Sequence, residues 1–212
     1  MSGAVLPQRN NILLEHISWD TFQALLNDWG DHRPGRITYD HGVLEIMALS
    51  KKHEASKSVI GRLIEAFTEE LEIDLSGVGS TTLHLEVEDR GLEPDECYYI
   101  QNESRVRNEE DLDLTRDPPP DLAIEMDITR SSLDRSGIYA SLRIPEIWRY
   151  DGKTLRIYRL ARKGHYNQVE RSTALPKLPV SEFVGFLRQR GTMSDTRLVR
   201  SFRKWVRTRF AT

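Results

Sequence analysis

The sequence is almost free of cysteine, with one residue, Cys97, in a chain of 212. A single thiol cannot form an internal disulfide and cannot build a cysteine-based zinc cluster, so both are excluded. Proteins without a disulfide framework are typical of the reducing cytoplasm, and we expect this protein to work there.

Long apolar runs are also missing. No stretch approaches the roughly 20 consecutive apolar residues that a membrane-spanning helix needs. The first ten residues lack a basic region followed by an apolar core, so we expect no secretory signal. The chain also contains no internal repeat, no glycine-rich phosphate loop and no Gly-x-Ser-x-Gly nucleophile turn. The nucleotide-binding and hydrolase classes that depend on these motifs are therefore not indicated.

What is present fits a soluble globular protein, with 38% hydrophobic and 30% charged residues. A chain of this length can fill one good-sized core. The net charge of −3 is unevenly placed, because the segment from Arg188 to the end holds eight basic residues and one acid. That segment carries +7 and the rest −10. We expect one domain over residues 1–190, with its core at about 35–160, followed by a basic helical tail over 191–212.

The basic tail has two interpretations that the sequence leaves open. It could contact the phosphate backbone of a nucleic acid, or it could be a solvated helix face or lie against the acidic body. The candidate nucleic-acid-binding residues are Arg200, Arg203, Lys204 and Arg207.

Periodicity and capping signals predict helices and strands in alternation. A hairpin is expected over 36–47, with its turn at 40–42, and a polar loop over 101–120. The expected helices are 18–29, 50–73, 131–142 (capped by Ser131 or Ser132), 180–188 and 197–210. The other expected strands are 81–88, 95–100, 122–129, 147–150, 155–160 and 168–172, with a break over 90–94. This order is typical of an α/β or α+β fold.

The segment from Asp121 to Thr129 shows the clearest pattern of chemical interest. Apolar and polar residues alternate, which predicts a strand with Glu125 and Asp127 on one face, about 7 Å apart. Two such carboxylates repel each other unless a positive charge lies between them, and hard oxygen ligands suit Mg²⁺ or Mn²⁺. The alternative is an edge strand whose acids face water.

A second acid, Asp95, opens the preceding strand directly after Pro94. If the two strands are neighbours, Asp95 and Glu125 meet at one end of a sheet, an arrangement used to hold a metal ion for phosphodiester cleavage. The carbonyl of Met126 would complete the ligands. Spacing alone is a weak indication, because Pro-Asp is also a common turn.

Taken together in order, these motifs resemble the Uma2 family (DUF820) of the PD-(D/E)XK nuclease superfamily, in the form common among cyanobacterial copies. The resemblance covers about residues 35–160. It is carried by Gly42-Val-Leu-Glu-Ile-Met47, His53-Glu54, Pro94-Asp95, Asp121-Leu-Ala-Ile-Glu125, Ser131-Ser132 and Tyr139-Ala with Ile144-Pro-Glu-Ile-Trp148.

The resemblance implies a restriction-endonuclease-like core, a central mixed β-sheet flanked by helices, with a Mg²⁺-dependent site. Asp95 and Glu125 would be its two acids. The third motif position, usually lysine two residues after the second acid, is Asp127 here. The family's alternative lysine position on the next helix is Arg135. Arginine stays protonated, so it can position a phosphate and stabilise charge but cannot deprotonate water.

Further side chains are candidates for the same site. The resemblance implies that His53 orients a ligand or contacts phosphate, and Glu45, Glu54 and Glu65 are weaker candidates. Tyr139, one turn after Arg135, is either on the same helix face or a core aromatic residue.

Two hypotheses follow. The first is a Mg²⁺- or Mn²⁺-dependent DNA endonuclease that hydrolyses phosphodiester bonds through a metal-activated water. The alternative is a nuclease fold that no longer cleaves and serves as a binding or assembly module, which the arginine at 135 and the acidic body both favour. By analogy with the superfamily, in which double-strand cutting needs two sites, we expect a homodimer.

Overall fold

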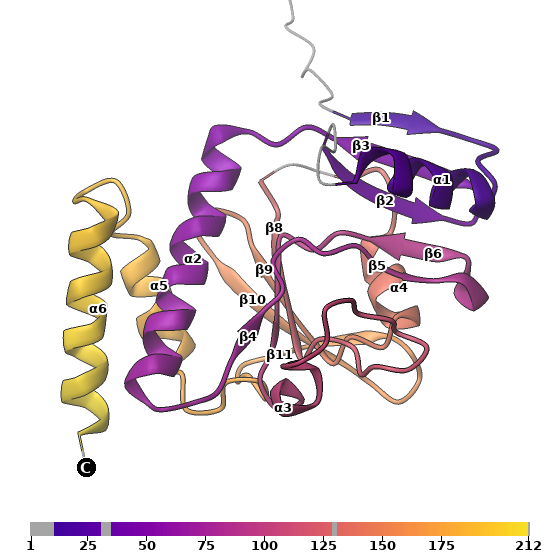
Figure 1. The fold of residues 1–212 in the computed structure, drawn as a ribbon. Helices are drawn as coiled ribbons and strands as arrows, with labels where there is room; N and C mark the ends of the chain where they lie inside the picture. Colours follow the sequence, from indigo (N-terminus) through magenta and orange to yellow (C-terminus); the bar gives the residue numbers. More distant parts are fainter. Residues whose placement is uncertain (1–10, 31–34, 129–130, 212) are drawn as a thin grey trace, which may run out of the picture.

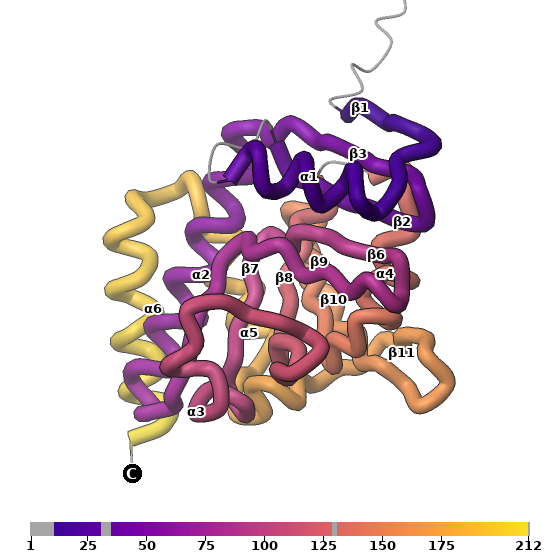
Figure 2. Tube along the Cα trace, turned by 45° about the vertical axis from the view of Figure 1, so that its right-hand side comes forward, coloured from indigo at the N-terminus to yellow at the C-terminus, as the bar shows by residue number. Residues whose placement is uncertain are grey.

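The arrangement of the chain is known from a computed structural model that describes residues 11–30, 35–128 and 131–211 (Figures 1 and 2). Within these residues, the larger sheet has six strands in the order β11-β10-β9-β8-β7-β4. All neighbours are antiparallel except β8 and β9, so the sheet is mixed, as expected. The strands are β4 (Ser76–Gly77), β7 (Glu96–Tyr99), β8 (Leu122–Met126), β9 (Glu146–Tyr150), β10 (Leu155–Leu160) and β11 (Tyr166–Val169).

The smaller sheet is antiparallel and has five strands in the described part of the chain, in the order β1-β3-β2-β6-β5. The predicted hairpin is confirmed: His41 and Gly42 take the positive φ angles, 46° and 84°, that a tight hairpin turn requires. The strands are β1 (Asn11–Leu14), β2 (Arg36–Asp40), β3 (Val43–Met47), β5 (Leu83–Leu85) and β6 (Arg90–Leu92).

The helices begin where local capping chemistry allows. Ser18 caps α1 (Trp19–Trp29), and Ser50 caps α2 (Lys51–Glu70) by accepting the His53 N–H at 3.2 Å. Both caps were predicted. The remaining helices are α3 (Glu103–Val106), α4 (Arg135–Ser141), α5 (Val180–Leu187) and α6 (Asp195–Phe210).

The larger sheet separates two sides of the molecule. One face packs against α2, α5 and α6 in the main core, which contains Trp148, Ile124 and Phe183. The other face packs against α4 through Ala123, Ile147 and residues of the smaller sheet. Because both faces are covered, every residue of β8 is buried despite its alternating sequence.

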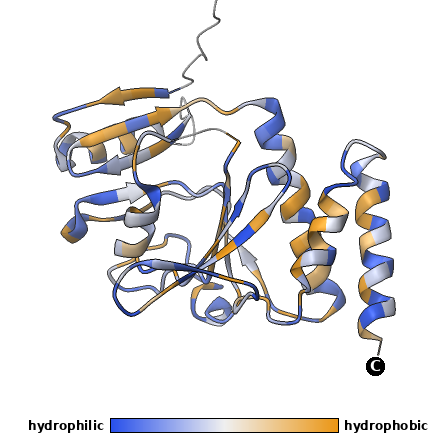
Figure 3. Ribbon diagram, turned by 180° about the vertical axis from the view of Figure 1, so that it is seen from behind, coloured by the Kyte–Doolittle hydropathy of each residue, from blue (hydrophilic) through white to orange (hydrophobic). Residues whose placement is uncertain are grey.

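Helix α6 lies against α2 at the edge of the molecule opposite the smaller sheet (Figure 1). Its ribbon alternates hydrophobic and hydrophilic segments (Figure 3), and its apolar face is buried in the main core. Arg203 bonds to Glu69 and, at 3.1 Å, to Glu70, while Arg207 donates to Glu70 at 2.6 Å. The segment expected as a basic tail therefore forms part of the packed structure.

Several predicted boundaries were wrong. The strand expected over 81–88 ends at Leu85, since residues Glu86–Glu88 form a 3₁₀ turn and Asp89 takes a left-handed φ of 49°. The chain reverses there into β6, where a break was expected. The helix expected from Ser131 begins at Arg135. The strand expected over 168–172 lies at Tyr166–Val169.

Two further predictions differ in extent. The loop expected over 101–120 contains the short helix α3. Thr129, at the end of the predicted central strand, and residues 1–10 lie outside the described residues. No helix in the described part of the chain is long and apolar enough to cross a membrane.

Candidate active site

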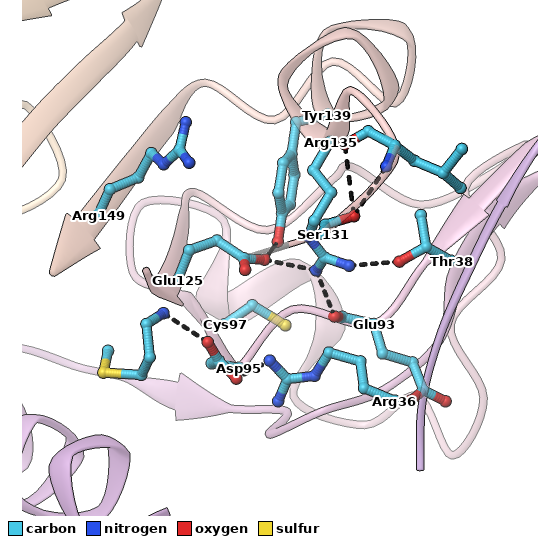
Figure 4. Close-up of polar contacts among 12 residues, drawn as sticks. Arg36, Thr38, Glu93, Asp95, Cys97, Glu125, Ser131, Arg135, Tyr139 and Arg149 are labelled. Atoms are coloured by element: carbon cyan, nitrogen blue, oxygen red, sulfur yellow. Dashed lines mark hydrogen bonds and ion pairs between the residues drawn. The ribbon is translucent and has the colours of Figure 1, made fainter. Parts of the chain in front are cut away.

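Asp95 and Glu125 face each other across β7 and β8. The register pairs Glu96 with Ile124, so the adjoining residues Asp95 and Glu125 are also opposite, and the Asp95 N–H donates to the Ile124 carbonyl at 3.1 Å. Both side chains line a pocket of about 430 Å³ that also reaches α4 and the first turn of α2. The expected meeting of the two acids is what the structure shows (Figure 4).

Asp95 is completely buried and held on both oxygens. Its Oδ2 accepts the Met126 N–H at 2.5 Å, and its Oδ1 is ion-paired with Arg36 and lies 3.0 Å from His53 Nε2. Burial lowers the pKa of the Arg36 guanidinium, although Glu125 acts in the opposite direction. Burial and then Arg36 also lower the pKa of His53, so the neutral imidazole is favoured.

Glu125 is bound through one oxygen. Its Oε1 accepts hydrogen bonds from Arg135 Nη2 at 2.6 Å and from the Tyr139 hydroxyl. Burial alone would raise the pKa of Glu125, but Arg135 and Arg36 outweigh it and hold that pKa below its ordinary value. Burial and the charge of Glu125 raise the pKa of Tyr139, which therefore stays protonated and able to donate.

Arg135 is the first residue of α4, and its side chain is 12% exposed. Besides Glu125, it donates to the Glu93 carbonyl at 2.7 Å and to the Thr38 hydroxyl. Burial opposes its charge, yet Glu125 raises its pKa, so Arg135 is a fixed cation. The planar guanidinium serves these three acceptors through its two terminal nitrogens, Nη1 and Nη2.

Asp127 contacts a different arginine. Its Oδ1 accepts from Arg149 Nε at 3.1 Å and Nη2 at 2.8 Å. Arg149 lies on β9, directly opposite Glu125 in the parallel register, and lines the pocket. Sequence reasoning missed Arg36 and Arg149, because only the tertiary structure brings Arg36 of the smaller sheet to Asp95 and places Arg149 opposite Glu125.

The three weaker glutamate candidates have different positions. Glu45 is buried and accepts from Ser131 Oγ at 2.5 Å, the Ser132 N–H at 2.7 Å and Asn11 Nδ2 at 2.8 Å. Glu54 lies 3.3 Å from His53 Nδ1, outside the pocket that holds Glu125. Glu65 is exposed on α2 and does not line the pocket.

The pocket offers only some of the oxygen ligands that a magnesium ion needs. Among the described residues, no three His, Cys, Asp or Glu side chains are grouped closely enough to hold a metal ion. Asp95, Glu125 and the Met126 carbonyl offer hard oxygen donors. Mg²⁺ is commonly held by one or two carboxylates together with water and substrate phosphates, so this set fits. The ion would have to compete with Arg36 for Asp95.

The candidate nucleic-acid-binding residues of α6 lie away from this pocket. Helix α6 packs on the face of the larger sheet that carries Ile124 and Trp148, whereas Glu125 and Arg149 extend from the opposite face. Of the four candidates, Arg203 and Arg207 are bonded to glutamates of α2, and Arg200 and Lys204 are exposed.

Comparisons with known proteins agree with this fold. The model of the Uma2 family, described as "putative restriction endonuclease", matches residues 19–190. A crystal structure of a putative nuclease of DUF820 from Anabaena variabilis superposes with a TM-score of 0.51 at 17% sequence identity, covering 71% of this chain and 90% of that one. At this identity the likeness shows a shared fold. A search of curated proteins gives no match.

Proposed function

This chain belongs to the Uma2 family, and on that premise we propose that it is a DNA endonuclease that hydrolyses phosphodiester bonds with the aid of Mg²⁺ or Mn²⁺. The observation that carries the proposal is the convergence of Asp95 and Glu125 in one polar pocket. Two buried acids at one point are costly, and a cleft that accommodates them is a candidate for chemistry.

The residues of the pocket have separable roles in this proposal. Asp95, Glu125 and the Met126 carbonyl hold the cation, which when bound polarises the phosphate and lowers the pKa of a water ligand. His53 orients Asp95 from its 3.0 Å contact. Arg135, a permanent cation beside Glu125, stabilises the negative charge that develops on the phosphate.

The test is cleavage of supercoiled plasmid with Mg²⁺ and with Mn²⁺ by the parent protein and by Asp95→Asn and Glu125→Gln. We expect cutting by the parent and at least a 100-fold loss in both variants, as for the loss of a charge-stabilising group. Glu65→Gln is the matched control, since Glu65 is exposed on α2 and does not line the pocket, and it should cut like the parent. Cutting that persists in the first two variants would show that the site is wrong.

A second candidate function is a binding or assembly module that does not cleave. The observation that favours it is that each acid already has an arginine partner, Asp95 with Arg36 and Glu125 with Arg135. These pairs balance the pocket's charge without a metal ion. Titration with Mn²⁺, followed by electron paramagnetic resonance, separates the two: the nuclease should bind Mn²⁺ and lose it on Asp95→Asn, whereas the module should not bind it.

A homodimer belongs to the same proposal, because cutting both strands of a duplex needs two sites. Light scattering of the purified chain at several concentrations tests it directly, and a mass near 24.5 kDa at all concentrations would contradict it.

A further inference from the structure

Four charged residues form one row across the larger sheet. Strand registers pair Glu125 of β8 with Arg149 of β9, and Arg149 with Arg156 of β10, while Asp95 lies opposite Glu125 on the other side. Residues opposite each other in neighbouring strands extend from the same face. With about 4.8 Å between strands, the backbone of Arg149 is about 5 Å from that of Glu125, and Arg156 is about 10 Å away. Two acids are therefore followed by two arginines.

The two arginines of the row differ from those that neutralise the acids. The side chains of Arg149 and Arg156 are 39% and 40% exposed, whereas that of Arg36 is 5% exposed. In Figure 4, Arg149 stands apart from the bonded cluster around Glu125 and Arg135. A ligand that enters from solvent can thus reach the row's arginines, whereas Arg36 is buried.

Each exposed arginine is oriented by an aspartate at the wall of the pocket. Asp127 accepts two nitrogens of Arg149, and Asp151 Oδ2 lies 3.2 Å from Arg156 Nη1. Asp151 is itself fixed by the N–H groups of Lys153 and Thr154, at 2.9 and 2.8 Å. A guanidinium has five N–H donors, and a single carboxylate oxygen cannot accept all of them. An arginine that is oriented by an aspartate therefore keeps donors with which it can bind a phosphate.

We propose that Arg149 and Arg156 bind DNA phosphates that neighbour the one at Asp95 and Glu125, so that a strand passes over β9 and β10. Asp127 and Asp151 are positioning residues that hold the two guanidiniums. The inference rests on the proposed function for the place of the reacting phosphate. It assigns the main phosphate contacts to this sheet face and not to α6, which packs on the opposite face of the larger sheet.

The test is binding of a fluorescent DNA duplex, measured by anisotropy in EDTA over a range of salt concentrations. Without a metal ion no cleavage takes place, so a failure of the nuclease proposal and a failure of this one are distinguishable. Arg149→Gln and Arg156→Gln should each weaken binding roughly tenfold, the effect of losing a charge-assisted hydrogen bond. Together they should reduce the slope of log affinity against log salt by about two.

Matched variants complete the design. Arg116→Gln removes another exposed arginine paired with aspartates, in the loop before β8, and should leave affinity unchanged. Arg200→Gln with Lys204→Gln, on α6, should have little effect. The inference is overturned if the parent protein does not bind the duplex, or if the variant with both Arg149→Gln and Arg156→Gln binds like the parent. It is also overturned if the variant with Arg200→Gln and Lys204→Gln is the one that reduces the slope of log affinity against log salt.

Asp127→Asn tests whether Asp127 orients Arg149 or affects DNA binding only through its negative charge. The substitution makes the protein more positive, so long-range electrostatics alone predicts tighter binding. A positioning role predicts weaker binding, because the neutral amide oxygen holds Arg149 Nε and Nη2 less firmly than the carboxylate Oδ1 does. Tighter binding by Asp127→Asn would overturn the role assigned to Asp127.

Discussion

At the scale of single residues, Arg135 shows how a departure from a motif is accommodated. The sequence shows arginine where the family's alternative lysine is expected, and the structure supplies three acceptors for it: Glu125, the Glu93 carbonyl and Thr38. Two of them, Glu125 and the Glu93 carbonyl, accept from Nη2, and Thr38 accepts from Nη1. Arginine at this position is therefore integrated into the fold, and its chemistry is limited to binding and stabilising negative charge.

Tyr139→Phe tests the bond between the Tyr139 hydroxyl and Glu125. Glu125 is buried and charged, so losing this donor should reduce the free energy of unfolding by about 1.5–3 kcal/mol at pH 7. Urea denaturation measures the change. Tyr166→Phe is the control, because the Tyr166 hydroxyl donates at 2.5 Å to the neutral carbonyl of Ile144, and its loss should cost about 0.5–1.5 kcal/mol. A cost for Tyr139→Phe no larger than the control's would contradict the charged bond.

At the scale of elements, the segment between β8 and α4 is held by a strand of the other sheet. Ser131 and Ser132 were expected to cap the helix, but their hydroxyl and N–H groups bind Glu45 of β3. The Ser131 O–H and the Ser132 N–H donate to the buried Glu45, while Ser131 Oγ accepts the Leu133 N–H, so this segment is fixed outside the helix. The helix consequently begins at Arg135, which brings Arg135 and Tyr139 over Glu125.

Glu45→Ala tests this connection. It leaves the Ser131 and Ser132 donors without their acceptor, and we expect a loss of about 3 kcal/mol in the free energy of unfolding, with faster hydrogen exchange over residues 131–142. Glu45→Gln, which keeps one carbonyl acceptor, should restore part of both. Glu86→Ala, an exposed acid in the 3₁₀ turn, should change neither. Unchanged exchange over 131–142 in Glu45→Ala would show that Glu45 does not position α4.

At the scale of the whole molecule, the larger sheet divides the packing helices from the polar pocket. Helices α2, α5 and α6 cover one face, while the acids and the row of arginines occupy the other. Only the first turn of α2 reaches the pocket, through His53. Folding therefore buries a histidine next to Asp95, and this couples global stability to pH.

His53→Gln tests that coupling. Burial and Arg36 lower the pKa of His53 in the folded protein, whereas in the unfolded chain it is about 6.5. The folded state binds fewer protons, so the contribution to stability is complete above about pH 6.5 and is lost as the pH falls below it. We expect the parent's free energy of unfolding, measured in urea from pH 8 to 5.5, to fall below pH 6.5 more steeply than that of the variant. Equal slopes would contradict the shifted pKa.

The sequence by itself determined features that depend on near neighbours. The caps at Ser18 and Ser50, the positive-φ turn at Gly42 and the alternation of Leu122 to Met126 each act within a few residues. The ordered motifs also indicated the family and the meeting of Asp95 with Glu125. Local preferences are strong there because no distant partner competes with them.

Only the tertiary structure decided which charges share the pocket. Arg36 reaches Asp95 from β2 of the smaller sheet, and Arg149 is placed opposite Glu125 by the pairing of β9 with β8. No spacing in the sequence encodes either contact. Burial raises the free-energy cost of leaving a charge unpaired, so the contacts of buried charges outweigh the local preferences of the sequence. The buried charge of Glu45 likewise holds the Ser131 O–H and the Ser132 N–H, whereas α6 is held by the burial of its apolar face in the core.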